Sequence, residues 1–344
     1  MLLYKNPLKL LICIWFILPL AVAQETKDVH LKNIRQLTFG GENAEAYFSQ
    51  DEKNIIFQST RNGYGCDQIY TMTAKGKKLK MVSTGKGRCT CGFFSPDGKA
   101  IIFASTHVEE DSCPPRPDYS QGYVWPLYKT YEIFLAKPDG SNLKRLTDSY
   151  GYDAECVFSP DGKKILFTSD RDGDLELYEM DTQGNNVKRL TNSPGYDGGA
   201  FYSADGKLIC FRAQVIKDSA ELKDYQNLLE QGLIRPSKLE LFIMNADGSG
   251  RKQITSNGAA NFCPYFSPDG EKIIFSSNMH DPKGRNFELC LINIDGTGLE
   301  QITYNDVFDA FPMFTSDGKK LVFASNRNAK VKGETNIFIA DWVE

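Results

Sequence analysis

The feature that most constrains this chain is a short turn that recurs six times along its 344 residues. In its clearest copy, residues 158–162 read Phe-Ser-Pro-Asp-Gly and lead into an apolar run. Proline fixes φ for a turn and glycine accepts a positive φ, so each copy predicts two antiparallel strands joined by a hairpin. The turn aspartates are Asp51, Asp97, Asp161, Asp205, Asp269 and Asp317. By subtraction they lie 46, 64, 44, 64 and 48 residues apart, a spacing typical of propeller blades that carry two insertions.

A second marker shows how such a ring would close. Each repeat is expected to hold four strands, in the third repeat residues 154–159, 164–169, 175–181 and 187–191, and the fourth strand ends in an aliphatic residue followed by Thr or Ser. The first marker, Leu37-Thr38, precedes every complete repeat, whereas the last repeat stops after its third strand, residues 336–341. We therefore predict an all-β, six-bladed β-propeller of four-stranded blades, closed by an N-terminal strand at residues 34–38 that completes the last blade.

The first 23 residues have the pattern of a signal peptide. Lys5 and Lys9 precede an apolar run, and Ala21-Val22-Ala23 supplies a cleavage site. A membrane anchor is the alternative, but the run is short and Pro19 interrupts it. We expect a lead-in at residues 24–33, a propeller at 34–344, and no membrane span after cleavage. Loss of the two lysines takes the net charge from −4 to −6, which argues against nucleic acid as a partner.

Eight of the nine cysteines remain after signal removal. Cys66, Cys89 and Cys113 fall in or beside loops of the first two repeats, where a disulfide is compatible with an exported protein. Cys210 and Cys290 lie in apolar strands and are expected to be buried thiols. No ligand set of a familiar metal site is present, so we expect neither a metal nor a cofactor.

The Ser-Pro-Asp-Gly-Lys turns, the Arg-Leu-Thr strand ends and the Glu-Leu-Tyr or Glu-Ile-Phe strands resemble the TolB-like six-bladed β-propeller family. The resemblance runs from about Ile34 to Trp342. It implies a free-standing propeller without a peptidase domain, with WD-like repeats. It also implies a partner that is an envelope protein or peptide in a periplasmic assembly.

Both insertions fall between the second and third strands of a blade, at residues 107–129 and 214–238, and are therefore expected on one face. The first contains Tyr123 and Trp125, which would form an aromatic binding platform or pack on their own blade. The second predicts a short helix from Ser219 to Gln231, capped by Ser219, whose apolar stripe would pack on the propeller or meet a partner.

The heads of the innermost strands supply the remaining candidate residues. Two equivalent sets are Asn43, Cys89, Asp153, Asp197, Asn261 and Asp309, and, two residues later, Glu45, Cys91, Glu155, Gly199, Cys263 and Phe311. Tyr152 and Tyr196 precede two of the aspartates, and Arg171 follows the second strand of its blade. The first set would either lock blade to blade through backbone hydrogen bonds or form an acidic ligand mouth with Glu45 and Glu155.

No nucleophile elbow and no zinc-protease motif is present. The sequence therefore favours an exported, non-catalytic module, periplasmic or extracellular, that binds a protein, a peptide or a glycan through the face with the insertions. The alternative is a carbohydrate-active or peptide-processing enzyme that uses carboxylates at the channel mouth. A purely structural ring that assembles through its edges is a third class.

Overall fold

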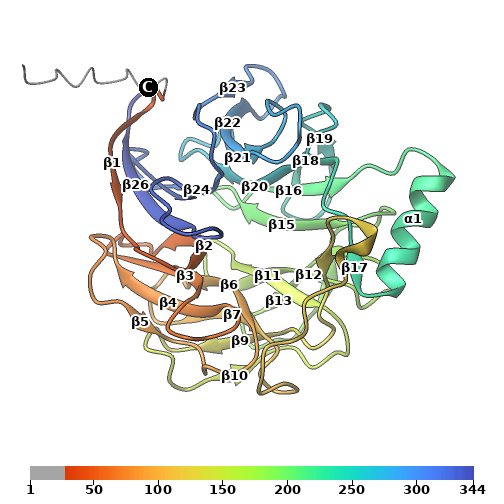
Figure 1. The fold of residues 1–344 in the computed structure, drawn as a ribbon. Helices are drawn as coiled ribbons and strands as arrows, with labels where there is room; N and C mark the ends of the chain where they lie inside the picture. The colour runs from red at the N-terminus through yellow and green to blue at the C-terminus, as the bar shows by residue number, and fades with distance from the viewer. Residues whose placement is uncertain (1–27) are drawn as a thin grey trace, which may run out of the picture.

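The computed structural model describes residues 28–344, which form a closed ring of six four-stranded antiparallel sheets (Figure 1). The first three blades contain β2 (Glu42–Phe48), β3 (Asn54–Thr60), β4 (Gln68–Thr73), β5 (Lys80–Met81); β6 (Cys89–Phe94), β7 (Ile101–Ser105), β9 (Glu132–Ala136), β10 (Lys144–Arg145); and β11 (Asp153–Phe158), β12 (Lys164–Ser169), β13 (Glu176–Asp181), β14 (Lys188–Arg189). The last three contain β15 (Asp197–Tyr202), β16 (Leu208–Gln214), β18 (Leu239–Asn245), β19 (Lys252–Gln253); β20 (Asn261–Phe266), β21 (Lys272–Ser277), β22 (Glu288–Asn293), β23 (Glu300–Gln301); and β24 (Asp309–Phe314), β25 (Lys320–Ser325), β26 (Asn336–Trp342), β1 (Leu31–Gln36).

The predicted closure is confirmed, because β1 pairs antiparallel with β26 and completes the sixth blade. The strand begins three residues earlier than expected. Asn33 adopts a positive φ of 51° at a register shift, where a bulge accommodates one extra residue of β1, and Leu31 still pairs with Trp342. An ion pair of 3.0 Å between Asp28 and Arg327 ties the lead-in to the same blade. The predicted signal peptide lies outside the described residues.

Hydrogen bonds explain why both sequence markers recur. In the third blade, the Ser159 hydroxyl and the Lys163 backbone N–H both donate to the Asp161 carboxylate, at 2.7 and 3.1 Å, which fixes the turn and lowers the pKa of Asp161. The hydroxyl of Thr191 accepts a 2.9 Å hydrogen bond from the backbone N–H of Leu177. Equivalent bonds occur in all six blades, so the terminal Thr or Ser anchors an outer strand that is only two residues long in five of them.

The two insertions meet over the insertion face, which we define as the face that carries the loops between the second and third strands of the blades. β8 (Trp125–Pro126) pairs with β17 (Leu233–Ile234), so the insertions do lie on one side, as predicted. The helix α1 (Ser219–Glu230) flanks this small sheet (Figure 1). Its N-cap is Asp218, not Ser219 as predicted, because the Asp218 carboxylate accepts hydrogen bonds from the backbone N–H groups of Ala220 and Glu221.

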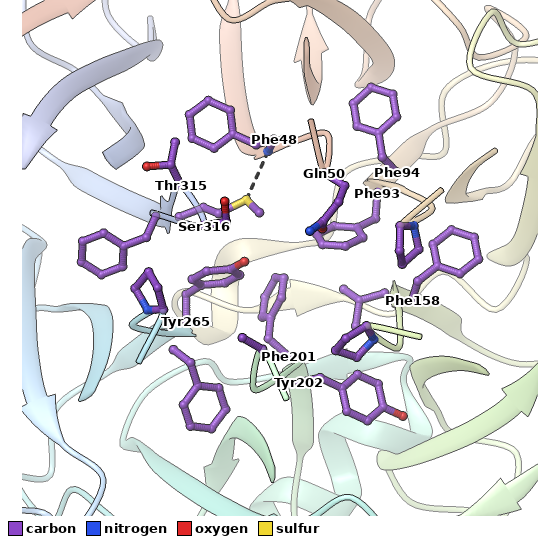
Figure 2. Close-up of a pocket in the computed structure, with 18 of the residues that line it drawn as sticks. Phe48, Gln50, Phe93, Phe94, Phe158, Phe201, Tyr202, Tyr265, Thr315 and Ser316 are labelled. Atoms are coloured by element: carbon purple, nitrogen blue, oxygen red, sulfur yellow. Dashed lines mark hydrogen bonds between the residues drawn. The ribbon is translucent and has the colours of Figure 1, made fainter. Parts of the chain in front are cut away.

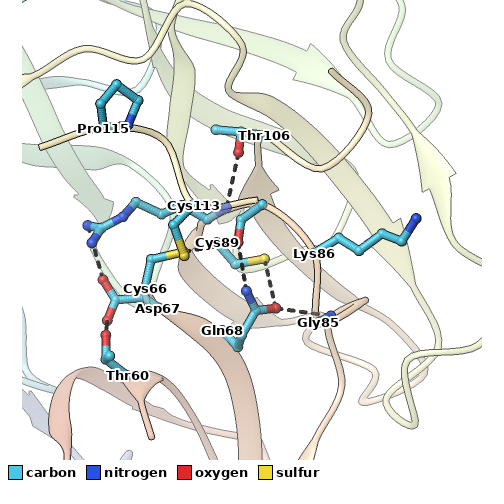
Figure 3. The surroundings of a disulfide bond; sticks show 12 residues. Thr60, Cys66, Asp67, Gln68, Gly85, Lys86, Cys89, Thr106, Cys113 and Pro115 are labelled. Carbon is cyan, nitrogen blue, oxygen red and sulfur yellow. Dashed lines mark hydrogen bonds and ion pairs between the residues drawn. A yellow bond between two sulfur atoms is a disulfide. The ribbon is translucent and has the colours of Figure 1, made fainter. Parts of the chain in front are cut away.

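A disulfide anchors the first insertion to the first blade. Cys66 follows β3 and Cys113 lies in the loop that leads to the 3₁₀ turn η1 (Tyr119–Gln121), as Figure 3 shows. Of the three loop cysteines for which a disulfide is compatible with the sequence, Cys66 and Cys113 form one and Cys89 is a buried thiol. Within residues 28–344, no helix combines the length and the apolar character needed to cross a bilayer.

Candidate functional site

Six equivalent β-bulges position the side chains that line the central channel. Each innermost strand shifts register against its neighbour at the same place, and the residue there has a φ between 52° and 57°. These residues are Glu45, Cys91, Glu155, Gly199, Cys263 and Phe311. Five of them carry a side chain in the left-handed region, at a cost of order 1 kcal/mol each, and the bulge turns these side chains into the channel.

Above the bulges the channel widens into a cavity of about 630 Å³, which we call the funnel. Its roof is formed by Trp125 and Ile234 of the two paired insertions. Its walls are mainly aromatic and include Tyr123, Tyr128, Tyr131, Tyr152, Tyr196, Phe262, Phe287, Phe308 and Phe311. A large, largely preformed hollow with apolar walls and few polar groups is the usual form of a binding site.

Arg212 of β16 is the central polar residue of the funnel. Its guanidinium is buried, forms an ion pair with Glu155, and donates a hydrogen bond to the Tyr196 hydroxyl. It also lies over the rings of Trp125 at 5.6 Å and Phe262 at 5.9 Å. Arg212 therefore connects the roof to the channel floor through a charge that is paired and surrounded by aromatic faces.

Two glycines make room for this cluster. An added Cβ at Gly199 would lie 2.1 Å from a nitrogen of Arg212, and one at Gly198 would lie 2.5 Å from a carboxylate oxygen of Glu155. The Gly199 N–H also donates a 2.8 Å hydrogen bond to Glu155. The fourth blade thus replaces the bulge side chain of its neighbours with space for an ion pair.

Glu45, in the first blade, is the second acid at the floor. It is half-buried and lines both the funnel and a narrow extension of about 30 Å³ beneath it. Burial raises the pKa of Glu45 to about 7, the nearby Glu155 charge adds to this, and the Cys91 thiol and Arg212 oppose it. Among the described residues, no basic side chain forms a salt bridge with Glu45, unlike Glu155.

An aromatic plug closes the channel below the floor. Tyr47, Phe93, Phe201 and Tyr265 pack against one another with ring centroids 5.3–6.0 Å apart. Figure 2 shows Phe93, Phe201 and Tyr265 extending toward the centre of the ring above a lower pocket of about 260 Å³, which the Ser-Pro-Asp-Gly turns surround. The funnel is consequently open to the insertion face and separated from the opposite one.

The first set of inner-strand residues does not line the funnel. Asp153 and Asp309 are fully buried and pair with Arg171 at 2.9 Å and Arg327 at 2.7 Å. Asp197 pairs with Arg251, and Asn43 and Asn261 donate to the backbone carbonyls of Thr335 and Leu239. Asn43 and Asn261 thus join neighbouring blades, as the blade-locking alternative has it, whereas the three aspartates pair with arginines of their own blades.

The structure therefore brings together half of the residues proposed from sequence. Glu45, Glu155, Tyr123, Trp125, Tyr152 and Tyr196 line the funnel, whereas Asn43, Asp153, Asp197, Asn261, Asp309 and Arg171 lie within or beside the blades. Sequence reasoning missed Arg212, Phe262, Phe287 and Phe308. A signal for Arg212 existed, because it is a charged residue inside the otherwise apolar strand β16.

The insertion face also carries exposed aromatic side chains, of which Tyr123 lines the funnel. The five aromatic residues with the highest exposure in the described part of the chain are Phe39, Tyr119, Tyr123, Tyr150 and Tyr304. All five lie in loops of the insertion face, either in the first insertion or in a connection that leads into an innermost strand. Exposed aromatic side chains that gather on one face of a protein are typical of interaction surfaces.

Comparison with known proteins agrees with the fold. A "Protein TolB homolog" of Chlorobium luteolum is 27% identical over 150 residues, which are 37% of this chain and 34% of the relative. The matches with the first curated relatives span about a third of those proteins or less.

Two solved structures share the architecture. A putative TolB from Agrobacterium tumefaciens has a TM-score of 0.60 and 20% identity, covering 90% of this chain and 94% of its own. An oligogalacturonate lyase from Vibrio parahaemolyticus has a TM-score of 0.54 and 15% identity, covering 92% and 95%. At such identities the likeness shows the fold alone.

The family model described as the TolB beta propeller domain matches residues 128–228 and 235–342. Together these segments exceed half of the 344 residues. The chain therefore belongs to the TolB beta propeller domain family.

Proposed function

We propose that this chain is an exported, non-catalytic module of the periplasm or cell envelope that binds a segment of a protein partner in the funnel. The observation that carries the proposal is the funnel itself, an aromatic cavity of about 630 Å³ that is open on the insertion face and closed below by the plug. Membership of the TolB beta propeller domain family supports a protein-binding role. Tyr123 at the funnel and the other exposed aromatic residues of the insertion face provide a surface for the rest of the partner.

The size and chemistry of the funnel fit a peptide segment. A peptide offers apolar side chains to aromatic walls and backbone groups to polar ones, and the funnel provides both. Truncating an aromatic hot-spot residue at the centre of an interface costs about 2 kcal/mol or more of binding free energy. Tyr123 and Phe308 are exposed enough for truncation without loss of the core.

Site-specific photo-cross-linking in the source cells tests the proposed face. A photoreactive phenylalanine at Tyr123 is expected to capture a partner, whereas the same residue at Leu299, an exposed apolar position in a turn on the opposite face, is expected to capture none. Tyr123→Ala and Phe308→Ala should each weaken binding of the captured partner at least tenfold, and Leu299→Ala should not. Cross-links that form only at position 299 would refute the proposed face.

One observation favours a second candidate, a carbohydrate-active or peptide-processing enzyme. Glu45, with a pKa raised to about 7 by burial, lies in a cavity near a second carboxylate, the arrangement that general acid–base chemistry requires. Incubation of the purified protein with oligogalacturonates and with peptides decides between the classes. Turnover that disappears in Glu45→Gln and Glu155→Gln would establish the enzyme, and its absence leaves the binding module.

A further inference from the structure

We propose that the funnel selects a ligand segment that carries a cationic group, a lysine-type side chain or a free amino terminus, which docks on Glu45. The inference rests on the proposed function and adds the chemical class of the ligand. It follows from the balance of charges at the floor and from the aromatic character of the walls.

The positive charges that line the funnel are already neutralised. Arg212 pairs with Glu155, Arg88 pairs with Asp67 at 3.3 Å, and Arg235 pairs with Asp224 at 3.4 Å. None of these cations requires a negatively charged ligand. The funnel therefore has no preference for an anion at its floor.

Glu45 is the acid of the floor whose charge is not paired in this way. Glu155 accepts hydrogen bonds from Tyr196, Thr168 and the Gly199 N–H in addition to its ion pair. Within residues 28–344, the donor recorded for the Glu45 carboxylate is the thiol of Cys91, which is a weak one. A carboxylate withdrawn from water and without a cation is unfavourable, so a ligand cation that reaches it gains the full charge-assisted hydrogen bond.

The walls favour the same kind of ligand. Tyr128, Phe287, Phe308 and Phe311 line the funnel with aromatic rings, and the faces of such rings attract cations. The protein already uses this chemistry for its own cation, because Arg212 lies over three rings. An alkylammonium group with an apolar stem would meet aromatic walls along its length and the Glu45 carboxylate at its end.

The neighbours of Glu45 also define how the selectivity should depend on pH. Glu155 of β11, Arg212 of β16, Asp67 of the first blade and the thiols of Cys91 and Cys263 surround it. Burial raises the pKa of the Cys91 thiol well above its usual value and that of Cys263 to about 12, so both thiols stay protonated at neutral pH. Because burial raises the pKa of Glu45 to about 7, this carboxylate gains its charge between about pH 6 and 8, and the preference for a cation should rise over that range.

Three short peptides and one charge-matched pair of variants test the proposal with the full-length mature protein. The probes are N-acetyl-Ala-Lys-Ala-amide, its norleucine analogue, and the norleucine peptide with a free amino terminus. Binding is measured by ligand-observed NMR at pH 6 and pH 8. Glu45→Gln removes the charge at the floor, and Glu271→Gln removes the same charge from an exposed position in a turn on the opposite face.

At pH 8 we expect the lysine peptide or the free-amine peptide to bind the wild-type protein and Glu271→Gln at least tenfold more tightly than the acetylated norleucine peptide. The ratio should fall to about one in Glu45→Gln and should be smaller at pH 6. Whichever of the two cationic peptides shows the preference identifies the preferred cation as a lysine-type side chain or a free amino terminus. Equal binding of the three probes, no detectable binding of either cationic probe, or a preference that survives in Glu45→Gln would overturn the inference, while cross-linking through Tyr123 would still uphold the proposed function.

Discussion

Replacing Arg212 by methionine removes the one charge that connects the roof of the funnel to its floor. Methionine keeps most of the aliphatic volume, so the change acts mainly on the Arg212–Glu155 ion pair and on the contacts with Trp125 and Phe262. Removing one partner of a buried ion pair costs about 3–5 kcal/mol, because the other charge is left buried without compensation. Glu155 keeps three neutral donors, which places the expected cost near the lower end, about 3 kcal/mol.

Thermal unfolding followed by circular dichroism measures this cost. With an unfolding entropy of about 2.1 cal/mol/K per residue and about 300 folded residues, a loss of about 3 kcal/mol lowers the midpoint by roughly 5 °C. Arg35→Met is the matched control, because Arg35 is an exposed residue of β1, and it should shift the midpoint by less than about 1 °C.

A second substitution, at Glu155, distinguishes the loss of the ion pair from the loss of packing. The double variant Arg212→Met/Glu155→Gln leaves no unpaired carboxylate at position 155, so it should recover more than half of the lost stability. An Arg212→Met protein that unfolds within 1 °C of the wild type, or a double variant less stable than the single one, would refute the assignment of Arg212 as the central residue of the cluster.

Three further outcomes follow from the structure. Cys66→Ala/Cys113→Ala should lower the free energy of unfolding by about 2–4 kcal/mol and make residues 107–129 sensitive to protease, whereas an insertion that resists cleavage would show that the bridge is dispensable. Glu45→Gln should raise the unfolding midpoint at pH 8 but not at pH 5. Burial raises the pKa of Glu45 in the folded protein to about 7, so the wild type loses stability as the pH rises from the lower pKa of the unfolded chain to the higher pKa of the folded one. A constant difference in midpoint between the two proteins across this range would contradict the assignment. A mature chain that lacks residues 28–38 should aggregate in light-scattering assays, because β26 becomes an unpaired edge, and a monomeric product would argue against closure.

The architecture could be predicted from sequence because each marker performs the same local task in every blade. Asp161 fixes its turn and Thr191 anchors the short outer strand through hydrogen bonds that any copy of the pattern can form. Counting the copies was then enough to deduce that the two chain ends share a blade, as the pairing of β1 with β26 confirms. Repetition converts weak local signals into a strong global one.

The lining of the channel could be predicted only in part, because it depends on bulges that the sequence does not mark. A regular strand would place Asp153 and Glu155 on the same side, and both were therefore assigned to the channel mouth. The bulge changes this relation, so that Glu155 enters the channel and Asp153 stays buried beside Arg171. Glycine would signal such a left-handed position, but only Gly199 of the six bulge residues is one.

The contacts between the two insertions could not be predicted from their local sequence either. Their lengths and shared face followed from the strand count, but the pairing of Trp125–Pro126 with Leu233–Ile234 joins segments more than 100 residues apart. The sequence offers two alternatives for Trp125, packing on its own blade or an aromatic binding platform. In the structure, Trp125 packs against Phe262 of the fifth blade, with tilted rings and a centroid distance of 5.1 Å, as part of the roof.

The position of this roof determines which side of the funnel a ligand can use. The hydrophobic cluster beneath it draws its buried residues from the second to the fifth blades, including Leu127, Tyr152 and Phe262. The first and sixth blades contribute none of these buried residues, and Glu45 belongs to the first blade. The paired insertions therefore cover the Arg212–Glu155 cluster, which needs protection from water to keep its strength, and leave the approach to Glu45 on the side that they do not cover. The extra length of the second and fourth blades thus lies over the blades that hold the structural ion pair, while the proposed cation site at Glu45 belongs to a blade outside this cluster.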